Sequence, residues 1–240
     1  MEPVSAPTRR PAVAVMAKVP GVVAVKSRLH PALGAETATR LYECFLRDRL
    51  DALSTLEGID RVIAFTPPEA RGVIADLAPL EFALRAQCGA DLGARLSHLL
   101  AELLAAGHAA AIAIDSDSPT LPMSYVTDAA RVLATSEAEV VVGPCDDGGY
   151  YLIGVRQPHP ELFETMPWST ERVLSLTLER ARHLGLRTHV LPPWFDVDTE
   201  ADLIRLQGEL ARRQTGPLRT MALMRELVAV GVFSARHRKG

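Results

Sequence analysis

The sequence lacks the features that mark membrane proteins and nucleic-acid-binding proteins. No apolar run approaches the roughly 20 residues that a membrane-spanning helix requires, so we expect no membrane span. The 26 Lys and Arg residues are outnumbered by 29 Asp and Glu residues. The resulting net charge of -3 provides no basic surface for wrapping nucleic acid, so no nucleic-acid partner is expected. Small anionic ligands can still be bound by a local group of cations.

Cysteine is also scarce, and its three occurrences are far apart at Cys44, Cys88 and Cys145. An odd number at this spacing fits neither a disulfide framework nor a metal-binding knuckle. Two arginines precede an apolar segment near the N-terminus, but Lys18 and Pro20 interrupt it before it reaches the length of a secretion signal. We therefore expect a cytoplasmic protein.

Apolar, β-branched segments alternate with helical patterns along the chain. Several are apolar on both faces, which is typical of strands in a sheet that helices cover on both sides. Ser169 is expected to cap one helix and Gly185 to end it. The alternation predicts an α/β fold with a mostly parallel central sheet. The expected strands are 11–17, 61–65, 81–85, 110–114, 139–143, 150–155 and 187–191, and the expected helices are 41–53, 91–106, 123–134, 170–184 and 218–230.

The length of 240 residues allows one large domain with a well-buried core, and we expect one domain rather than two. The predicted organisation is a flexible N-terminus over 1–11, the α/β domain over 12–213, and a C-terminal helix with a basic tail over 214–240. We expect the basic end, residues 236–239, to be a solvated terminus rather than a binding site.

Three cations lie in the segment that follows the first expected strand, at Lys18, Lys26 and Arg28. Open α/β sheets bind ligands beyond the carboxyl ends of their strands. Lysine offers phosphate a point charge and arginine a planar fork, so we predict phosphate binding here; the alternative is an exposed basic loop. The segment contains neither a Walker motif nor a dinucleotide fingerprint.

Two carboxylates, Asp115 and Asp117, follow another buried strand and flank Ser116. If the strand geometry continues, both side chains point to the same side and can face one ion. Carboxylate oxygens are suited to Mg²⁺ or Mn²⁺. We predict metal binding, and the alternative is ordinary turn or cap chemistry.

A second pair of carboxylates, Asp196 and Asp198, occurs just before a helix. The spacing by itself favours helix capping, with Thr199 or Asp198 as the N-cap. On the residues alone, metal binding at this pair is the weaker of the two interpretations.

An acidic turn with two glycines joins two expected strands at Asp146, Asp147, Gly148 and Gly149. Glycine lets a ligand approach the backbone closely. A carboxylate in that position, Asp147 in particular, can accept hydrogen bonds from sugar hydroxyls or deprotonate an acceptor. The alternative is a simple hairpin turn, for which Asp-Gly is a standard signal.

Several of these segments resemble, in the same order, those of a bacterial glycosyltransferase-like family of unknown function (DUF2064 type). This family is part of the nucleotide-diphospho-sugar transferase superfamily and is related to phospholactate and molybdenum-cofactor guanylyltransferases. The resemblance extends over about residues 12–206. It is carried by Met16–Leu29, Gln87–Leu96, Asp115–Leu121, Gly143–Gly154, Trp168–Thr170 and Phe195–Leu203.

The resemblance implies a single Rossmann-like domain of the A-type glycosyltransferase fold. It also implies that Asp117 is a metal ligand and that an aspartate of the second pair completes the metal site. Asp198 is the first choice for this second ligand, and Asp196 is the next. The segment around Gln87 lies near the base and ribose in related folds. With these implications, the predicted nucleotide-binding residues are Lys18, Lys26, Arg28, Gln87, Gly89 and Ser116, and the predicted substrate-binding residues are Asp146, Asp147, Gly148, Gly149 and Trp168.

The function predicted from this set is that of a metal-dependent glycosyltransferase with a nucleoside diphosphate-sugar donor and a small-molecule acceptor. Mg²⁺ or Mn²⁺ and the basic loop would stabilise the departing diphosphate, with Lys26 and Asp147 as catalytic residues. The alternatives are a nucleotidyltransferase that releases pyrophosphate and a nucleotide-binding protein without turnover.

One residue of the basic loop departs from the family pattern, because Val23 stands where the family has glycine. A β-branched residue tolerates a positive φ poorly. We therefore expect a loop that is rebuilt around Gly21 or one that approaches phosphate less closely.

Overall fold

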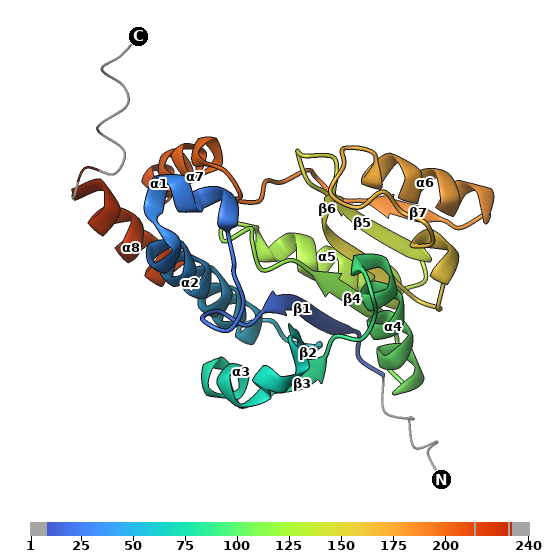
Figure 1. Ribbon diagram of the computed structural model, residues 1–240. Coiled ribbons are helices and arrows are strands. Elements are labelled where there is room, and N and C mark those ends of the chain that lie inside the picture. The colour runs from blue at the N-terminus through green and yellow to red at the C-terminus, as the bar shows by residue number, and fades with distance from the viewer. Residues whose placement is uncertain (1–8, 214, 230, 232–240) are drawn as a thin grey trace.

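A seven-stranded sheet forms the centre of the protein, with the strand order β3-β2-β1-β4-β6-β5-β7 (Figure 1). The computed structural model describes residues 9–213, 215–229 and 231, so residues 1–8 of the predicted N-terminal segment and the basic end at 236–239 lie outside the described residues. The strands are β1 (Ala12–Lys18), β2 (Asp60–Thr66), β3 (Phe82–Ala86), β4 (Ala111–Ile114), β5 (Val140–Pro144), β6 (Tyr150–Val155) and β7 (Thr188–Val190).

The directions of the strands confirm a mostly parallel sheet. β1 pairs in parallel with β2 and β4, β2 with β3, and β5 with β7. β6 runs antiparallel to both β4 and β5. Because β6 opposes both of these neighbours, the six other described strands share one direction, and their carboxyl ends meet at one edge of the sheet.

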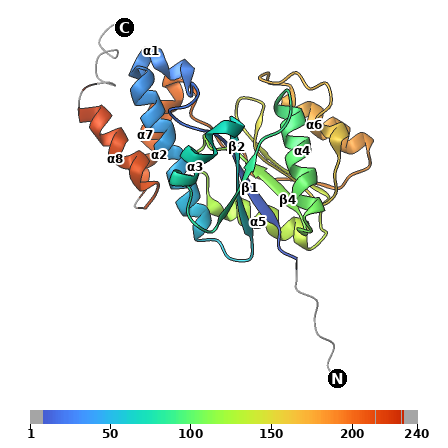
Figure 2. The same ribbon diagram turned by 60° about the horizontal axis from the view of Figure 1, so that its bottom comes forward.

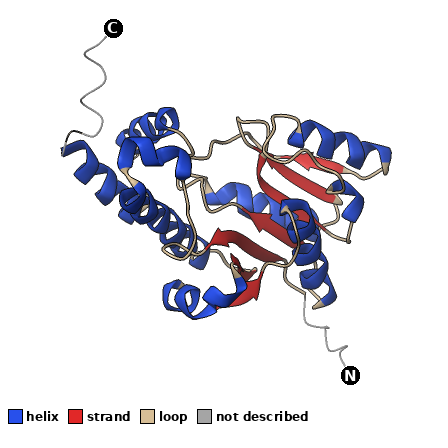
Figure 3. Ribbon diagram, in the orientation of Figure 1, coloured by secondary structure: helices blue, strands red, loops and turns tan. Residues whose placement is uncertain are grey.

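The sheet is buried on both faces, as its continuous apolar strands predict. In β1, Val13 and Val15 belong to one core cluster, whereas Ala12 and Ala14 belong to the cluster on the opposite face. This division follows from the period of two along a strand. The first cluster includes residues of α2 (Ala35–Ser54) and α5 (Met123–Ala134), and the second includes residues of α4 (Leu92–Ala105) and α6 (Val173–His183), so helices cover both faces (Figures 2 and 3).

The helix positions differ from the sequence patterns mainly at their starts. α2 begins at Ala35, six residues before the predicted start at residue 41. α6 begins at Val173 with Arg172 as its N-cap, so the prediction that Ser169 caps this helix is wrong. Ser169 instead adopts a φ of 63°, which a residue at an N-cap does not have. α3 (Arg71–Leu77) was not predicted, because seven residues give too short a periodic pattern. None of the described helices is both long and apolar enough to cross a membrane.

The short helices are η1 (Ser27–Leu29), α1 (His30–Leu33), η2 (Pro68–Ala70) and η3 (Pro160–Leu162). The longer helix α7 is Glu200–Arg212. Thr199 is the N-cap of α7, and its side chain forms a capping box with Asp202. Of the two predicted N-cap candidates, Thr199 is therefore the cap, and the side chain of Asp198 does not cap the helix.

The C-terminal helix α8 (Leu218–Ala229) packs against α2. Asp48 of α2 is 6% exposed and accepts hydrogen bonds from the backbone N–H groups of Arg219 (3.1 Å) and Thr220 (2.8 Å). A carboxylate at a helix N-terminus satisfies amide groups that have no partner within the helix. A third core cluster, with Phe45 of α2 and Leu223 of α8, lies between the helices.

Glycine at position 143 is required by the packing of the sheet. A Cβ built on Gly143 would overlap the ring of Tyr151, whose hydroxyl donates to the carbonyl oxygen of Pro192 at 3.0 Å. We predict that Gly143→Ala lowers the free energy of unfolding by about 1–3 kcal/mol, because the ring must leave its place.

The matched control is Gly208→Ala in α7, where a Cβ meets nothing within 4 Å. This variant should raise the stability by about 0.5–1 kcal/mol, because alanine is the better helix former. Urea unfolding of both variants measures the difference, and equal stabilities would contradict the packing argument.

Candidate functional site

The predicted site segments gather at the carboxyl edge of the sheet. Apart from Trp168, which follows β6, each of them follows one of the parallel strands β1, β3, β4, β5 or β7, and these strands end at the same edge. Backbone hydrogen bonds join the segments: the Val197 N–H donates to the Asp117 carbonyl at 3.0 Å, and the Asp146 N–H donates to the Trp194 carbonyl at 3.1 Å. The sequence thus brings separate polar segments to one surface.

Lys26 is the central cation of this edge. Its Nζ lies 3.1 Å from Oδ1 of Asp117 and 3.6 Å from Oδ1 of Asp198. The Lys26 side chain is 3% exposed, whereas the two carboxylates are 37% and 35% exposed. Burial by itself lowers the pKa of Lys26, but the charges of Asp117 and Asp198 outweigh burial and raise it. Lys26 is therefore a charged ammonium between two carboxylates.

Arg28 extends the same ionic chain outward. Its Nη1 lies 2.9 Å from Oδ2 of Asp198, and its side chain is 67% exposed. Lys18 is also exposed, and its backbone N–H donates to the hydroxyl of Tyr42 at 3.0 Å. Both exposed cations can therefore reach a ligand from the solvent side.

The basic loop is built around Gly21, which has a φ of 78°. Among the described residues other than glycine, Lys26 (φ 49°) has a positive φ, but Val23 does not. The left-handed conformations of this loop thus lie at Gly21 and Lys26, and the valine does not have to adopt one.

Asp115 belongs to a buried polar group below the surface of the edge. It accepts hydrogen bonds from Ser118 and, at 3.4 Å, from Arg49, whose guanidinium also donates to the carbonyl oxygen of Ser118. Burial raises the pKa of Asp115 to about 6, although the charge of Arg49 opposes this rise. Both carboxylate oxygens are engaged by the protein, and a metal-binding role for Asp115 stays a prediction.

Ser116 is likewise engaged by the protein. Its hydroxyl, which is buried, donates to the carbonyl oxygen of Met16 at 3.0 Å and lies 2.9 Å from the hydroxyl of Tyr42. Burial raises the pKa of Tyr42, so this phenol stays neutral. The Ser116 hydroxyl is thus bonded to groups of β1 and α2, and contact with a nucleotide stays a prediction.

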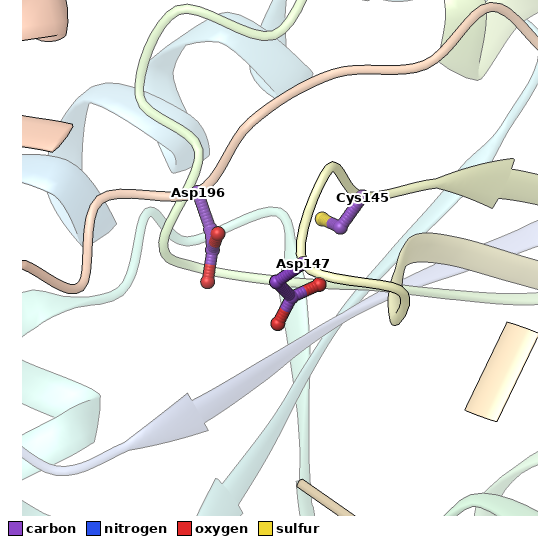
Figure 4. A group of neighbouring side chains, drawn as sticks. All are labelled: Cys145, Asp147 and Asp196. Carbon is purple, nitrogen blue, oxygen red and sulfur yellow. The ribbon is translucent and has the colours of Figure 1, made fainter. Parts of the chain in front are cut away.

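The structure also brings together Cys145, Asp147 and Asp196, whose candidate ligand atoms all lie within 4.8 Å of one another (Figure 4). Burial, and then the charge of Asp147, raises the pKa of Asp196 to about 7. Burial also raises the pKa of the Cys145 thiol. Asp196, predicted as a metal ligand beside Asp198, thus lies beside Asp147 of the glycine turn, and within the described residues neither of these two carboxylates forms an ion pair.

The glycine turn has the geometry of a tight hairpin. β5 and β6 pair antiparallel, and the Gly149 N–H donates to Oδ1 of Asp147 at 2.8 Å. Gly148 has a φ of 86°, and a Cβ there would overlap the backbone of Glu171. Asp146 forms an ion pair with Arg205 of α7 at 2.6 Å. The hairpin alternative therefore describes the backbone, while the Asp147 side chain remains exposed.

Two other predicted residues also contact the protein. The side-chain amide of Gln87 donates to the carbonyl oxygens of Ala17 (3.3 Å) and Ala64 (2.7 Å) at the edge of the sheet. Gly89 has a φ of 140°, and a Cβ there would overlap Ala94. These contacts hold the segment against the sheet, and contact with a base stays a prediction.

Trp168 packs into the protein. Its ring forms an edge-to-face contact with Tyr150 at 6.4 Å and lies against Gly93, where a Cβ would overlap it. This is the packing role that a large aromatic side chain commonly has. Stacking of Trp168 on a sugar stays a prediction.

Tyr42 and Arg49 are the site residues that the sequence analysis missed. Both lie on the buried side of α2, and Arg49 is 2% exposed. By its spacing along the helix, Tyr42 cannot be told from the apolar core residues Leu46, Leu50 and Leu53. The available signal was the two adjacent charged residues Asp48 and Arg49 among these apolar residues, because charged side chains are rarely buried without a partner.

The strand order, the single antiparallel strand among the described strands and the polar carboxyl edge define a Rossmann-like fold of the nucleotide-diphospho-sugar transferase type. The chain belongs to the bacterial family described as "Uncharacterized protein conserved in bacteria (DUF2064)", whose model matches residues 49–170. No curated protein matches the sequence.

Solved structures share this fold. A Desulfovibrio desulfuricans G20 protein, provisionally described as a nucleotide-diphospho-sugar transferase, is 30% identical, with a TM-score of 0.81 over 92% of this chain and 96% of that one. The fold is also similar to 4-diphosphocytidyl-2C-methyl-D-erythritol synthase from Anaerococcus prevotii DSM 20548 (11% identity, TM-score 0.55, 85% and 97% of the two chains). The inositol-1-phosphate CTP transferase from T. maritima is similar at 16% identity (TM-score 0.52, 85% and 95%).

The buried pair of Arg49 and Asp115 leads to a stability prediction. Arg49→Met leaves the carboxylate of Asp115, which is 18% exposed, without its counter-ion, and we expect a loss of about 3 kcal/mol. The double variant Arg49→Met/Asp115→Asn should lose less than the sum of the two single variants, because neither charge is then left alone. Urea unfolding in EDTA measures the coupling, and additive losses would show that the pair does not interact.

Proposed function

We propose that the protein is a metal-dependent glycosyltransferase that uses a nucleoside diphosphate-sugar donor and a small-molecule acceptor. The observation that carries the proposal is the group of Lys26, Asp117 and Asp198 at the carboxyl edge of the sheet, where two loops hold carboxylates around one cationic position. The description of the Desulfovibrio relative as a nucleotide-diphospho-sugar transferase supports this class of donor.

The residues at this position fit Mg²⁺ or Mn²⁺. Asp117 and Asp198 offer hard oxygen ligands, and each is about one-third exposed, so that water and phosphate oxygens can complete a coordination shell. We assign Asp117 and Asp198 as the protein ligands, with Asp196 and Asp115 as supporting carboxylates. Bound there, the cation would neutralise charge that develops on the departing diphosphate.

The cations of the basic loop would bind the phosphates. Arg28 and Lys18 are exposed, so they can contact phosphate oxygens without losing a buried partner. Lys26 lies deeper, beside the carboxylates, where a contact with the diphosphate would stabilise the leaving group. The nucleotide site would be bordered by the segments that follow β3 and β4, which contain Gln87, Gly89 and Ser116.

Asp147 and Asp196 favour glycosyl transfer over nucleotidyl transfer. A hydroxyl acceptor has to lose a proton as it attacks, so it needs a base within reach. A phosphate nucleophile is already anionic and needs none. The exposed carboxylate of Asp147, close to Asp196 and next to Gly148 and Gly149, is placed to serve as that base. Asp146 and Trp168 would flank the acceptor region.

The test offers purified full-length protein a panel of nucleoside diphosphate-sugars and nucleoside triphosphates with Mg²⁺ or Mn²⁺. We expect hydrolysis or transfer that releases free nucleoside diphosphate from one sugar nucleotide. Release of pyrophosphate from a triphosphate would instead indicate a nucleotidyltransferase. Binding without either product would indicate a nucleotide-binding protein without turnover.

Two variants test the assigned roles in the same assay. Asp117→Asn and Asp147→Asn should each lower kcat/KM by about 100-fold or more, because one removes a metal ligand and the other the base. Asp76→Asn is the matched control, an equally conservative change of an exposed aspartate on α3, and should leave the rate unchanged. Full activity of Asp117→Asn would exclude the assigned metal ligand.

A further inference from the structure

Lys26 occupies the position between the two carboxylates that we assign to the metal. Its ammonium is within 3.1 Å of an Asp117 oxygen and 3.6 Å of an Asp198 oxygen, although these residues come from different loops. It is also far more buried than either carboxylate, at 3% against 37% and 35% exposure. The ammonium is therefore a buried part of the site and not an exposed surface charge.

The charges of the site explain why a cation has to be there. Two carboxylates that face one point repel each other, and this repulsion is strong where water is partly excluded. The ammonium of Lys26 relieves it in the absence of any ligand. A divalent cation placed on the same two carboxylates would lie close to that ammonium, and the two positive charges would repel. The two cations are thus alternative partners of Asp117 and Asp198.

A phosphate group provides the ammonium with another partner. Lysine carries its charge on a flexible four-carbon stem with three rotatable donors, so the charge can move without a change in the fold. Arg28 and Lys18 on the same loop are exposed and would bring phosphate to the neighbourhood of Lys26. Arg28 also pairs with Oδ2 of Asp198 at 2.9 Å, so an arriving diphosphate that engages both Lys26 and Arg28 would leave both carboxylates free for a metal ion.

We infer that Lys26 is an internal substitute for the divalent cation, so that the metal site opens when a nucleotide phosphate engages Lys26. Metal and nucleotide then bind with positive coupling, and the free protein has a low affinity for the metal alone. The inference rests on the proposed function, since it concerns the assigned metal ligands and a phosphate-bearing donor.

The first test measures Mn²⁺ binding to the full-length protein without nucleotide, by the electron paramagnetic resonance signal of free Mn²⁺. Wild type should bind weakly. Lys26→Gln and Lys26→Met should bind at least tenfold more tightly, because the competing ammonium is gone. Lys18→Gln is the matched control: it removes the same charge from the same loop but not from between the carboxylates, and should change the affinity less than twofold.

The same variants are also compared by thermal unfolding. Lys26→Gln leaves two carboxylates without their cation, so its Tm should fall below that of wild type, and Mn²⁺ should raise it by more than it raises the wild-type Tm. This readout needs no activity. Adding Asp117→Asn to Lys26→Gln should abolish the gain in Mn²⁺ affinity, and a gain that persists would overturn the inference, because the ion would then be bound elsewhere.

The second test measures the coupling. The nucleoside diphosphate with the largest thermal shift among UDP, GDP, CDP and ADP is added, with correction for its Mn²⁺ complex in solution. It should raise the Mn²⁺ affinity of wild type at least tenfold, and Mn²⁺ should raise the nucleotide affinity by the same factor. In Lys26→Gln the factor should fall to less than one-third of the wild-type value.

The outcomes separate the inference from the proposed function. Tight Mn²⁺ binding to nucleotide-free wild type, unchanged or weakened by Lys26→Gln and Lys26→Met, would overturn the inference and leave the metal site standing. No Mn²⁺ binding to any variant, with or without nucleotide, would overturn both the inference and the assigned metal ligands.

Discussion

The shared direction of six described strands determines where the polar chemistry of this protein lies. Because their carboxyl ends meet at one edge, the segments after β1, β3, β4, β5 and β7 meet there as well. The faces of the sheet leave no room for charged side chains at its centre, since helices cover both faces and strands β4 and β5 are apolar throughout. The edge is therefore the place where charged side chains from distant parts of the sequence can face one another.

Crowding of aspartates at this edge makes cations a structural requirement. Arg49 compensates Asp115 from below, and Lys26 compensates Asp117 and Asp198 from the loop. Asp196 forms no ion pair within the part of the chain that the structure describes, and burial with the charge of Asp147 raises its pKa although the charge of Lys26 opposes the rise. In one part of the edge, the negative charge of the aspartates is thus neutralised by Lys26 and Arg49. In the other part, near the glycine turn, Asp147 and Asp196 form no such ion pairs within the described residues. This unequal distribution, rather than the number of acidic residues, separates the proposed phosphate side from the proposed acceptor side.

Much of the fold follows from the sequence, because β-branched apolar runs and amphipathic repeats are signals of local structure. All seven strands were expected close to their observed limits, and so was α5, whereas the first six residues of α2 were missed because they lack the apolar repeat of the rest of the helix. The start of α6 was misplaced, because Ser169 and Glu171 imitate a helix start whose actual position depends on packing. The segments of the candidate site were also evident. Their contacts were not: the ion pairs of Lys26, and the buried partners of Ser116 and Asp115 on α2, depend on side chains that meet only in the folded protein.

Helix α2 links two regions that the sequence keeps far apart. Within its 20 residues, Tyr42 and Arg49 contact the segment after β4, while Asp48 holds the first turn of α8. Removal of α8 would uncover a buried carboxylate and an apolar surface on the same rod that supports Ser116 and Asp115. A C-terminal truncation that removes α8 is therefore not a remote change, because α8 packs against the helix that contacts the candidate site.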